Sequence, residues 1–269
     1  MSFEQPGDFR DESDALYRLL ADLKDEDFNR PTRFKKWTIG EIITHLHTWN
    51  WGVEQALVDE PVFVRFFAGY IAERETVTLR AYEKRWADPL HGRALLEAWR
   101  LKYIQVAELF QTAEPKRRLK WAGPDMSVRM CITARQMETW AHGLALYDLL
   151  GVERVDTDRI HNIAVLGINT FGWTFNTHQQ PLPALRPHVR LTAPSNAIWT
   201  WNEDSESELI EGSASEFCQV VTQVRNIADT RLKVVGESAT RWMGIAQCFA
   251  GPPEIPPAPG TRFRETIAS

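Results

Sequence analysis

Glu138 and His142 are the residues of this chain whose types and spacing most directly suggest chemistry. They stand four positions apart in a segment expected to be helical, so both side chains lie on one helix face, within reach of a single metal ion. A histidine far upstream, His45 or His47, would supply a third ligand. Two imidazoles and one carboxylate leave a coordination position open, which distinguishes a catalytic zinc site from a structural one.

A solvated ion pair is the simpler interpretation of the same spacing. Such a pair stabilises a helix by about 0.3 kcal/mol and needs no metal. Apolar residues flank Glu138 and His142, however, and place them at the edge of the face that points to the core. Ionisable groups near a core need partners, and a shared cation would be one. The residues alone leave both interpretations open, and they do not choose between His45 and His47. The flanking apolar residues are Ala134, Met137, Ala141, Ala145 and Leu149.

Two further residues lie on the same expected helix. Arg135, three positions before Glu138, is either a partner of the metal site or an ordinary surface residue. Cys131, seven positions before Glu138, is expected to be a small buried side chain.

Helices are expected to position these groups. The aromatic and charged stretch 61–86 predicts one or two of them. Thr38 and Glu41 form a capping-box pattern at the start of another, and Gly151 stands where a left-handed C-cap is expected. Apolar residues recur at helical spacing in four further segments, residues 11–24, 38–57, 92–111 and 127–150.

The residues after Gly151 follow a different pattern, which predicts an α+β domain. The tail after Gly251 is rich in proline and is expected to be extended. The expected domains are residues 1–152 and 153–269. Helices are predicted at residues 159–176, 215–227 and 236–249. Short strands are predicted at residues 188–192, 197–201, 208–211 and 230–235.

The composition excludes several classes of protein. With 43% hydrophobic and 25% charged residues the chain is of globular type, and its net charge of −5 provides no basic field for nucleic acid. No apolar run approaches the ~18 residues of a membrane span, and no signal-peptide pattern opens the chain. The three cysteines are an odd number without a CxxC pair, so neither a disulfide framework nor a zinc ribbon is expected. A cytoplasmic location is the resulting expectation.

Two segments resemble the metal-binding helical domain of mycothiol-dependent maleylpyruvate isomerases, which belongs to the wider superfamily of damage-inducible (DinB-like) four-helix bundles. In that family a Trp and a short helical run precede a His-Leu pair, matched here by Trp37, His45 and Leu46. A late helix of the family carries Glu-x-x-x-His, matched by Glu138 and His142. The resemblance therefore implies a DinB-like four-helix bundle, followed by a smaller α+β domain of the sterol-carrier type.

The resemblance also selects the ligands. It favours His45 over His47, so the implied metal ligands are His45, Glu138 and His142. A site of this composition favours Zn²⁺, with Ni²⁺, Fe²⁺ and Mn²⁺ as alternatives. The loop 121–127 is similar to that of a subgroup of the family known only for metal binding.

The activity implied by the resemblance is the activation of a low-molecular-weight thiol, such as mycothiol, for attack on a small electrophile. Addition, bond rotation and release would make the protein a cis–trans isomerase, whereas a lasting adduct would make it a thiol S-transferase. Family members carry an Arg in the second domain that is linked to activity, and Arg225, at the end of the expected helix 215–227, matches it. An anionic intermediate would need such a partner. Alternatively, Arg225 only interacts with a helix C-terminus.

Two other functions compete with this hypothesis. The helical domain could bind metal without catalysis, as a regulator or scaffold. Part of the second half resembles a domain linked to wyosine formation in transfer RNA, although the acidic chain lacks a basic face. The expected partners are a small thiol and a small electrophile, rather than a membrane or nucleic acid. Both a monomer and a homodimer are compatible with the sequence.

Overall fold

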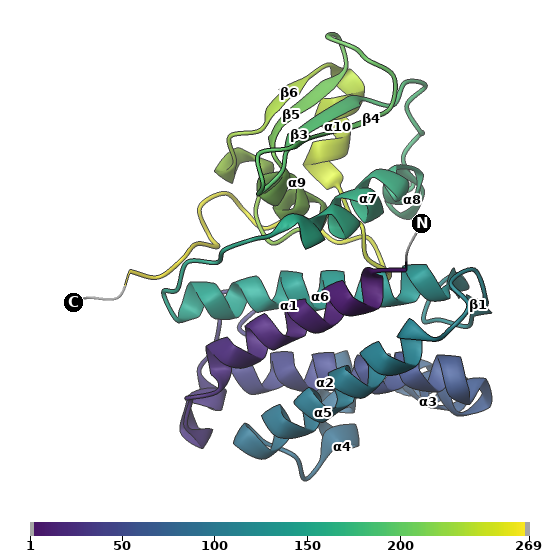
Figure 1. Cartoon of the computed structure of the whole chain (residues 1–269), viewed down its shortest axis with the longest axis vertical. Coiled ribbons are helices and arrows are strands. Elements are labelled where there is room, and N and C mark those ends of the chain that lie inside the picture. Colours follow the sequence, from purple (N-terminus) through teal and green to yellow (C-terminus); the bar gives the residue numbers. More distant parts are fainter. Residues whose placement is uncertain (1–2, 267–269) are drawn as a thin grey trace. The chain divides into compact units, whose positions relative to one another are not determined.

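The computed structural model describes residues 3–266 and divides into two compact units, residues 1–146 and 147–269. The first unit is a set of long helices, and the second contains a small β-sheet (Figure 1). We expected the division after residue 152. The observed boundary, after residue 146, instead lies within a helix that ends at Leu149.

The first unit is mostly helical, as predicted. Its helix α5 packs against both α1 and α2, and the aromatic stretch forms two helices, α3 and α4. A two-stranded antiparallel ribbon of β1 (Arg118–Leu119) and β2 (Met126–Ser127) precedes the last helix. The helices are α1 (Gln5–Leu20), α2 (Ile39–Val58), α3 (Glu60–Glu73), α4 (Leu79–Ala87), α5 (Gly92–Gln111) and α6 (Val128–Leu149).

The start of α2 is fixed by the predicted capping box. Thr38 Oγ1 accepts a hydrogen bond from the backbone N–H of Glu41 at 3.1 Å, and the backbone N–H of Thr38 donates to Glu41 Oε2 at 2.8 Å. This reciprocal pair satisfies two N–H groups that a helix start leaves without partners. His45 lies within α2, so the position of the cap sets which face of the helix carries its side chain.

The end of α6 is also as predicted. Gly151 has φ of +66°, and the backbone N–H of Gly151 donates to the carbonyl of Asp148 at 3.2 Å. Glycine takes up this left-handed conformation without the steric cost that a Cβ would bring.

Helix α1 starts earlier than predicted, at Gln5 rather than near residue 11, and ends at Leu20. Pro6 lies in its first turn, where a missing N–H costs no hydrogen bond. The apolar periodicity used for the prediction begins only further along, so it could not show this first turn.

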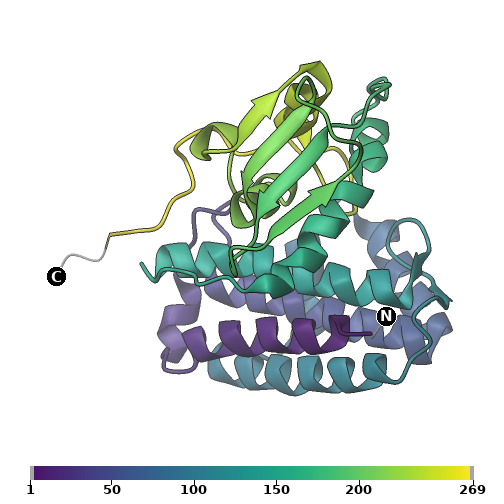
Figure 2. The ribbon, with the colours of Figure 1, turned by 45° about the horizontal axis from the view of Figure 1, so that its top comes forward.

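The second unit has a mixed sheet with strand order β4-β3-β5-β6 (Figure 2). Strands β3 and β5 pair in parallel, and the two outer pairs are antiparallel. Helix α9 (Ala214–Val221) packs on β3 and β5, and α10 (Glu237–Ile245) packs on β6. The four predicted strands are present as β3 (His188–Thr192), β4 (Ile198–Trp201), β5 (Leu209–Ser213) and β6 (Lys233–Val235).

All three helix predictions in this unit were wrong in extent, and the one at 236–249 forms α10, which ends at Ile245. The segment 159–176 forms α7 (His161–Asn169) and α8 (Phe171–Thr177), separated at Thr170, whose hydroxyl donates to the carbonyl of Leu166 at 2.7 Å. The segment 215–227 is helical only to Val221, so Arg225 follows the helix rather than ending it.

No helix within residues 3–266 is long and apolar enough to cross a membrane.

Candidate metal centre

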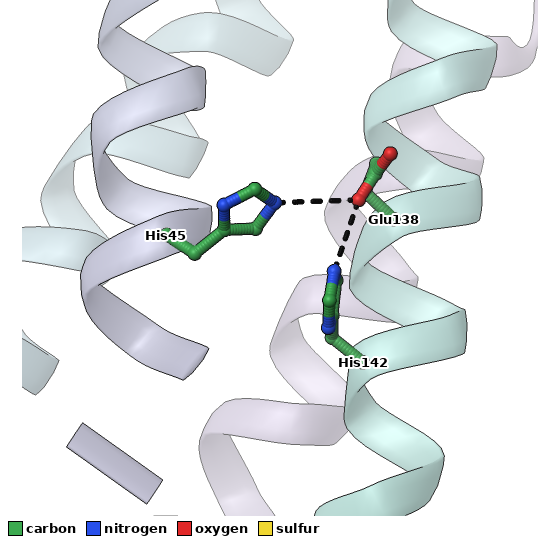
Figure 3. A group of neighbouring side chains, drawn as sticks. All are labelled: His45, Glu138 and His142. Atoms are coloured by element: carbon green, nitrogen blue, oxygen red, sulfur yellow. Dashed lines mark hydrogen bonds and ion pairs between the residues drawn. The ribbon is translucent and has the colours of Figure 1, made fainter. Parts of the chain in front are cut away.

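His45, Glu138 and His142 converge in the first unit (Figure 3). His45 projects from α2, whereas Glu138 and His142 project from successive turns of α6. Nε2 of His45 lies 3.4 Å from Glu138 Oε2, and Nε2 of His142 lies 3.2 Å from the same oxygen. One ligand atom from each of the three residues lies within 4.8 Å of the other two.

These distances fit a shared ion. Zinc holds nitrogen and oxygen ligands at about 2.0–2.2 Å, so two ligands of a tetrahedral ion lie about 3.3–3.6 Å apart. The 3.2 and 3.4 Å separations are close to that edge. All three ligand atoms lie within 4.8 Å of one another, so an approach of the two histidine nitrogens would let them surround one divalent ion. Their donor set of two imidazoles and a carboxylate suits zinc.

His47, the competing histidine of α2, points elsewhere. Its ring packs on Trp86 with 5.7 Å between centroids. Burial, helped by the charge of Lys102, lowers the pKa of His47 to about 4 and keeps the ring neutral. Residues two positions apart on a helix face different sides, so only one of the two histidines can meet Glu138.

Glu83 of α4 belongs to the same cluster, and our prediction missed it. Its Oε1 accepts hydrogen bonds from His45 Nδ1 at 2.8 Å and from Trp49 Nε1 at 2.7 Å. A carboxylate on the far nitrogen of a ligand histidine fixes the ring and directs the other nitrogen to the metal. Glu83 has no spacing relation to the predicted ligands, so the only available signal was an acidic residue in an aromatic stretch.

The electrostatics of the cluster are dominated by the two carboxylates. Burial disfavours the charged form of His45, but Glu83 and Glu138 outweigh it and raise the pKa of His45 to about 9. The pKa of Glu138 stays well below its usual value despite burial, because His142 and His45 donate to it. Burial lowers the pKa of His142. Glu138 and His142 are thus in the protonation states that a metal requires, and His45 would release a proton on binding.

Two aromatic side chains cover the cluster. The ring of Trp37 stacks on His142 with 5.7 Å between centroids and meets His45 edge-on at 5.5 Å. Phe34 meets His142 edge-on at 4.9 Å. Apolar walls of this kind restrict the rings of the ligands and limit the access of water.

Arg135 and Cys131 are both buried on α6. Arg135 is only 2% exposed, so it is not a surface residue. Burial raises the pKa of the Cys131 thiol to about 12, which keeps it protonated and makes it neither a good ligand nor a nucleophile.

Arg225 lies in the second unit, where it forms an ion pair. Its Nη2 donates to Asp148 Oδ1 at 2.7 Å, and its Nη1 donates to the backbone carbonyl of Val224 at 3.0 Å. Both partners of the ion pair are largely buried. The structure thus brings His45, Glu138 and His142 together within the first unit, whereas Arg225 belongs to the second unit, and its catalytic role stays a prediction.

Comparison with known proteins identifies the family. Residues 9–147 match the mycothiol maleylpyruvate isomerase N-terminal domain family. The chain belongs to this family. Two uncharacterized proteins of Mycobacterium tuberculosis, from strains CDC 1551 and H37Rv, are each 37% identical to this family member over 253 residues, 91% of this chain and 95% of theirs.

A solved structure shows the same fold. The crystal structure of the mycothiol-dependent maleylpyruvate isomerase is similar over 82% of this chain and 90% of that one, with a TM-score of 0.51 and 14% sequence identity. This confirms the predicted fold class, a DinB-like helical bundle followed by a smaller domain with a mixed sheet.

The ligand set can be tested by substitution. We expect His45→Ala and His142→Ala each to abolish stoichiometric zinc, because two ligands hold an ion far more weakly than three. His47→Ala changes the neighbouring histidine of α2 and should retain zinc. The measurement is zinc content by mass spectrometry after loading and gel filtration, with circular dichroism to check folding. Full zinc in both ligand variants would refute the site.

Glu83 has a separate test. Because Glu83 orients His45, Glu83→Gln should weaken zinc affinity by about 10- to 100-fold without removing a ligand. Glu54→Gln is the matched control, since Glu54 is also a buried carboxylate of the bundle but pairs with Lys102. Competition with a chromophoric chelator measures both affinities. Equal affinity in the Glu83 variant and the wild type would contradict this role.

Proposed function

We propose that the protein is an enzyme that uses a divalent metal ion, Zn²⁺ in the first instance, to activate a low-molecular-weight thiol against a small electrophile. The observation that carries the proposal is the convergence of His45, Glu138 and His142, with a donor set that leaves a position open. Membership of a family named for mycothiol-dependent isomerisation supports the choice of a thiol.

When bound, the ion would supply a Lewis acid that lowers the pKa of a thiol at its open position. The chain's own residues do the rest. Glu83 holds the proton of His45 on Nδ1, which leaves the lone pair of Nε2 for the ion. Trp37 and Phe34 pack on the histidine rings and limit the water that competes with the thiol.

Isomerase and transferase activities share their first step, the attack of the activated thiol on an electrophilic carbon. They differ in whether the thiol leaves after bond rotation or stays in the product. The residues of the metal centre serve both outcomes equally, so the substrate rather than the ligand set distinguishes the two. We therefore propose the shared step as the function.

A thiol-dependence assay tests this function. Zinc-loaded protein should turn over maleylpyruvate or a halobimane with mycothiol, whereas the same protein stripped with a chelator should not. Glutathione and cysteine show whether the thiol is specific, and His142→Ala is the inactive control. If zinc is bound stoichiometrically but none of these thiols supports turnover, the enzyme proposal fails for these substrates, and a non-catalytic metal-binding role becomes the better account.

We also propose Arg225 as the cation that stabilises the anionic intermediate. Arg225→Gln should then lower kcat by about 10²- to 10³-fold, because the variant loses a positive charge that stabilises the transition state. Its zinc content should be unchanged. Asp148→Asn removes the partner but keeps the guanidinium, so it should retain most of the activity. Steady-state kinetics of both variants decide the matter. Equal losses would show that the ion pair matters for structure, not the cation for catalysis.

A further inference from the structure

Arg135 is a buried cation on the helix that carries two of the proposed ligands. It lies three residues before Glu138 on α6, so the two side chains share a helix face. Arginine is almost never fully buried unless it is paired with an acid. Arg135 instead donates from Nε to Oδ1 of Asn50, a neutral residue, at 3.1 Å.

This arrangement leaves hydrogen-bonding capacity unused on both sides. Nη2 of Arg135 and Nδ2 of Asn50 are buried, and neither has a hydrogen-bond partner among residues 3–266. Buried polar groups without hydrogen bonds destabilise a folded core, so the pair of Arg135 and Asn50 contributes little to stability. A buried charge kept at such a cost points to a functional role.

The charges that act on Arg135 are those of the metal centre. Burial lowers the pKa of Arg135, and the carboxylates of Glu138 and Glu83 oppose this effect. The charge of Arg135 in turn disfavours protonation of His142. Arg135 therefore interacts electrostatically with two of the proposed ligands, Glu138 and His142, and with Glu83, the carboxylate that holds the third.

The charge balance follows from these residues. Two carboxylates, Glu83 and Glu138, neutralise a divalent ion, and the two histidines are neutral when they bind one. The guanidinium of Arg135 is then the excess charge of the site. Because the effective dielectric constant is low in a buried site, this excess favours an anion at the open position.

We propose that Arg135 is a positioning residue that acts through the bound ion and makes the site select an anionic fourth ligand, a thiolate rather than a neutral thiol or water. The inference rests on the proposed function only for the identity of the thiol. The electrostatic preference for an anion would apply to any small anion. It makes two predictions of opposite sign. Loss of the Arg135 charge strengthens the binding of a divalent ion, because repulsion is removed, and weakens the binding of an anion to that ion.

The experiment uses the full chain loaded with Co²⁺, whose visible spectrum reports ligand exchange, and azide as the anion. Arg135→Gln should bind Co²⁺ about tenfold more tightly and azide about tenfold more weakly than the wild type. Arg135→Lys keeps the charge and should remain close to the wild type in both. Arg80→Gln is the control, because Arg80 lies over Trp37 but is 37% exposed and screened by solvent.

A second variant keeps the test valid if Arg135→Gln does not fold. Asn50→Asp places a carboxylate on the guanidinium and neutralises it in place, so it should reproduce both shifts. If metal and anion affinities fall together, or if neither changes, the proposal is overturned and Arg135 is structural. Co²⁺ and azide binding without thiol turnover would refute the proposed function alone, since neither affinity depends on catalysis.

Discussion

Glu83 is a carboxylate with 1% of its surface exposed, and its burial is tolerable only because His45 and Trp49 donate hydrogen bonds to it. These bonds join α4 to α2 and fix the ring of His45. The opposite nitrogen of that ring then faces Glu138 on α6. Glu83 thereby orients His45, which links α2 to Glu138 on α6. Trp37 and Phe34 then pack on the ring of His142.

The cluster of His45, Glu138 and His142 differs from an ion-pair network optimised for stability. Glu138 accepts from two histidines through one oxygen, and among residues 3–266 the nearby buried Arg135 bonds the neutral Asn50 rather than an acid. A network optimised for stability would pair each charge and satisfy each donor. A divalent ion would replace the shared protons with coordination and would balance both carboxylates. The family membership of the chain is consistent with this use of the bundle.

Much of the fold was predictable because it is local. Apolar periodicity indicated the long helices, the Thr38–Glu41 pair marked the start of α2, and Gly151 marked the end of α6. The predictions failed where helices end inside a segment whose apolar spacing suggested that they continue. The predicted helix 159–176 is interrupted at Thr170, and α9 stops at Val221, before Arg225.

The sequence by itself determined that Glu138 and His142 share a helix face, since four residues make about one helical turn whatever the surroundings. It did not decide between His45 and His47 until a family resemblance was added, because that choice depends on which face of α2 meets α6. Only the tertiary structure placed Glu83 behind His45 and buried Arg135 against Asn50. The physical reason is that helical geometry is set by neighbours along the chain, whereas burial and charge pairing are set by residues that packing brings together from distant segments.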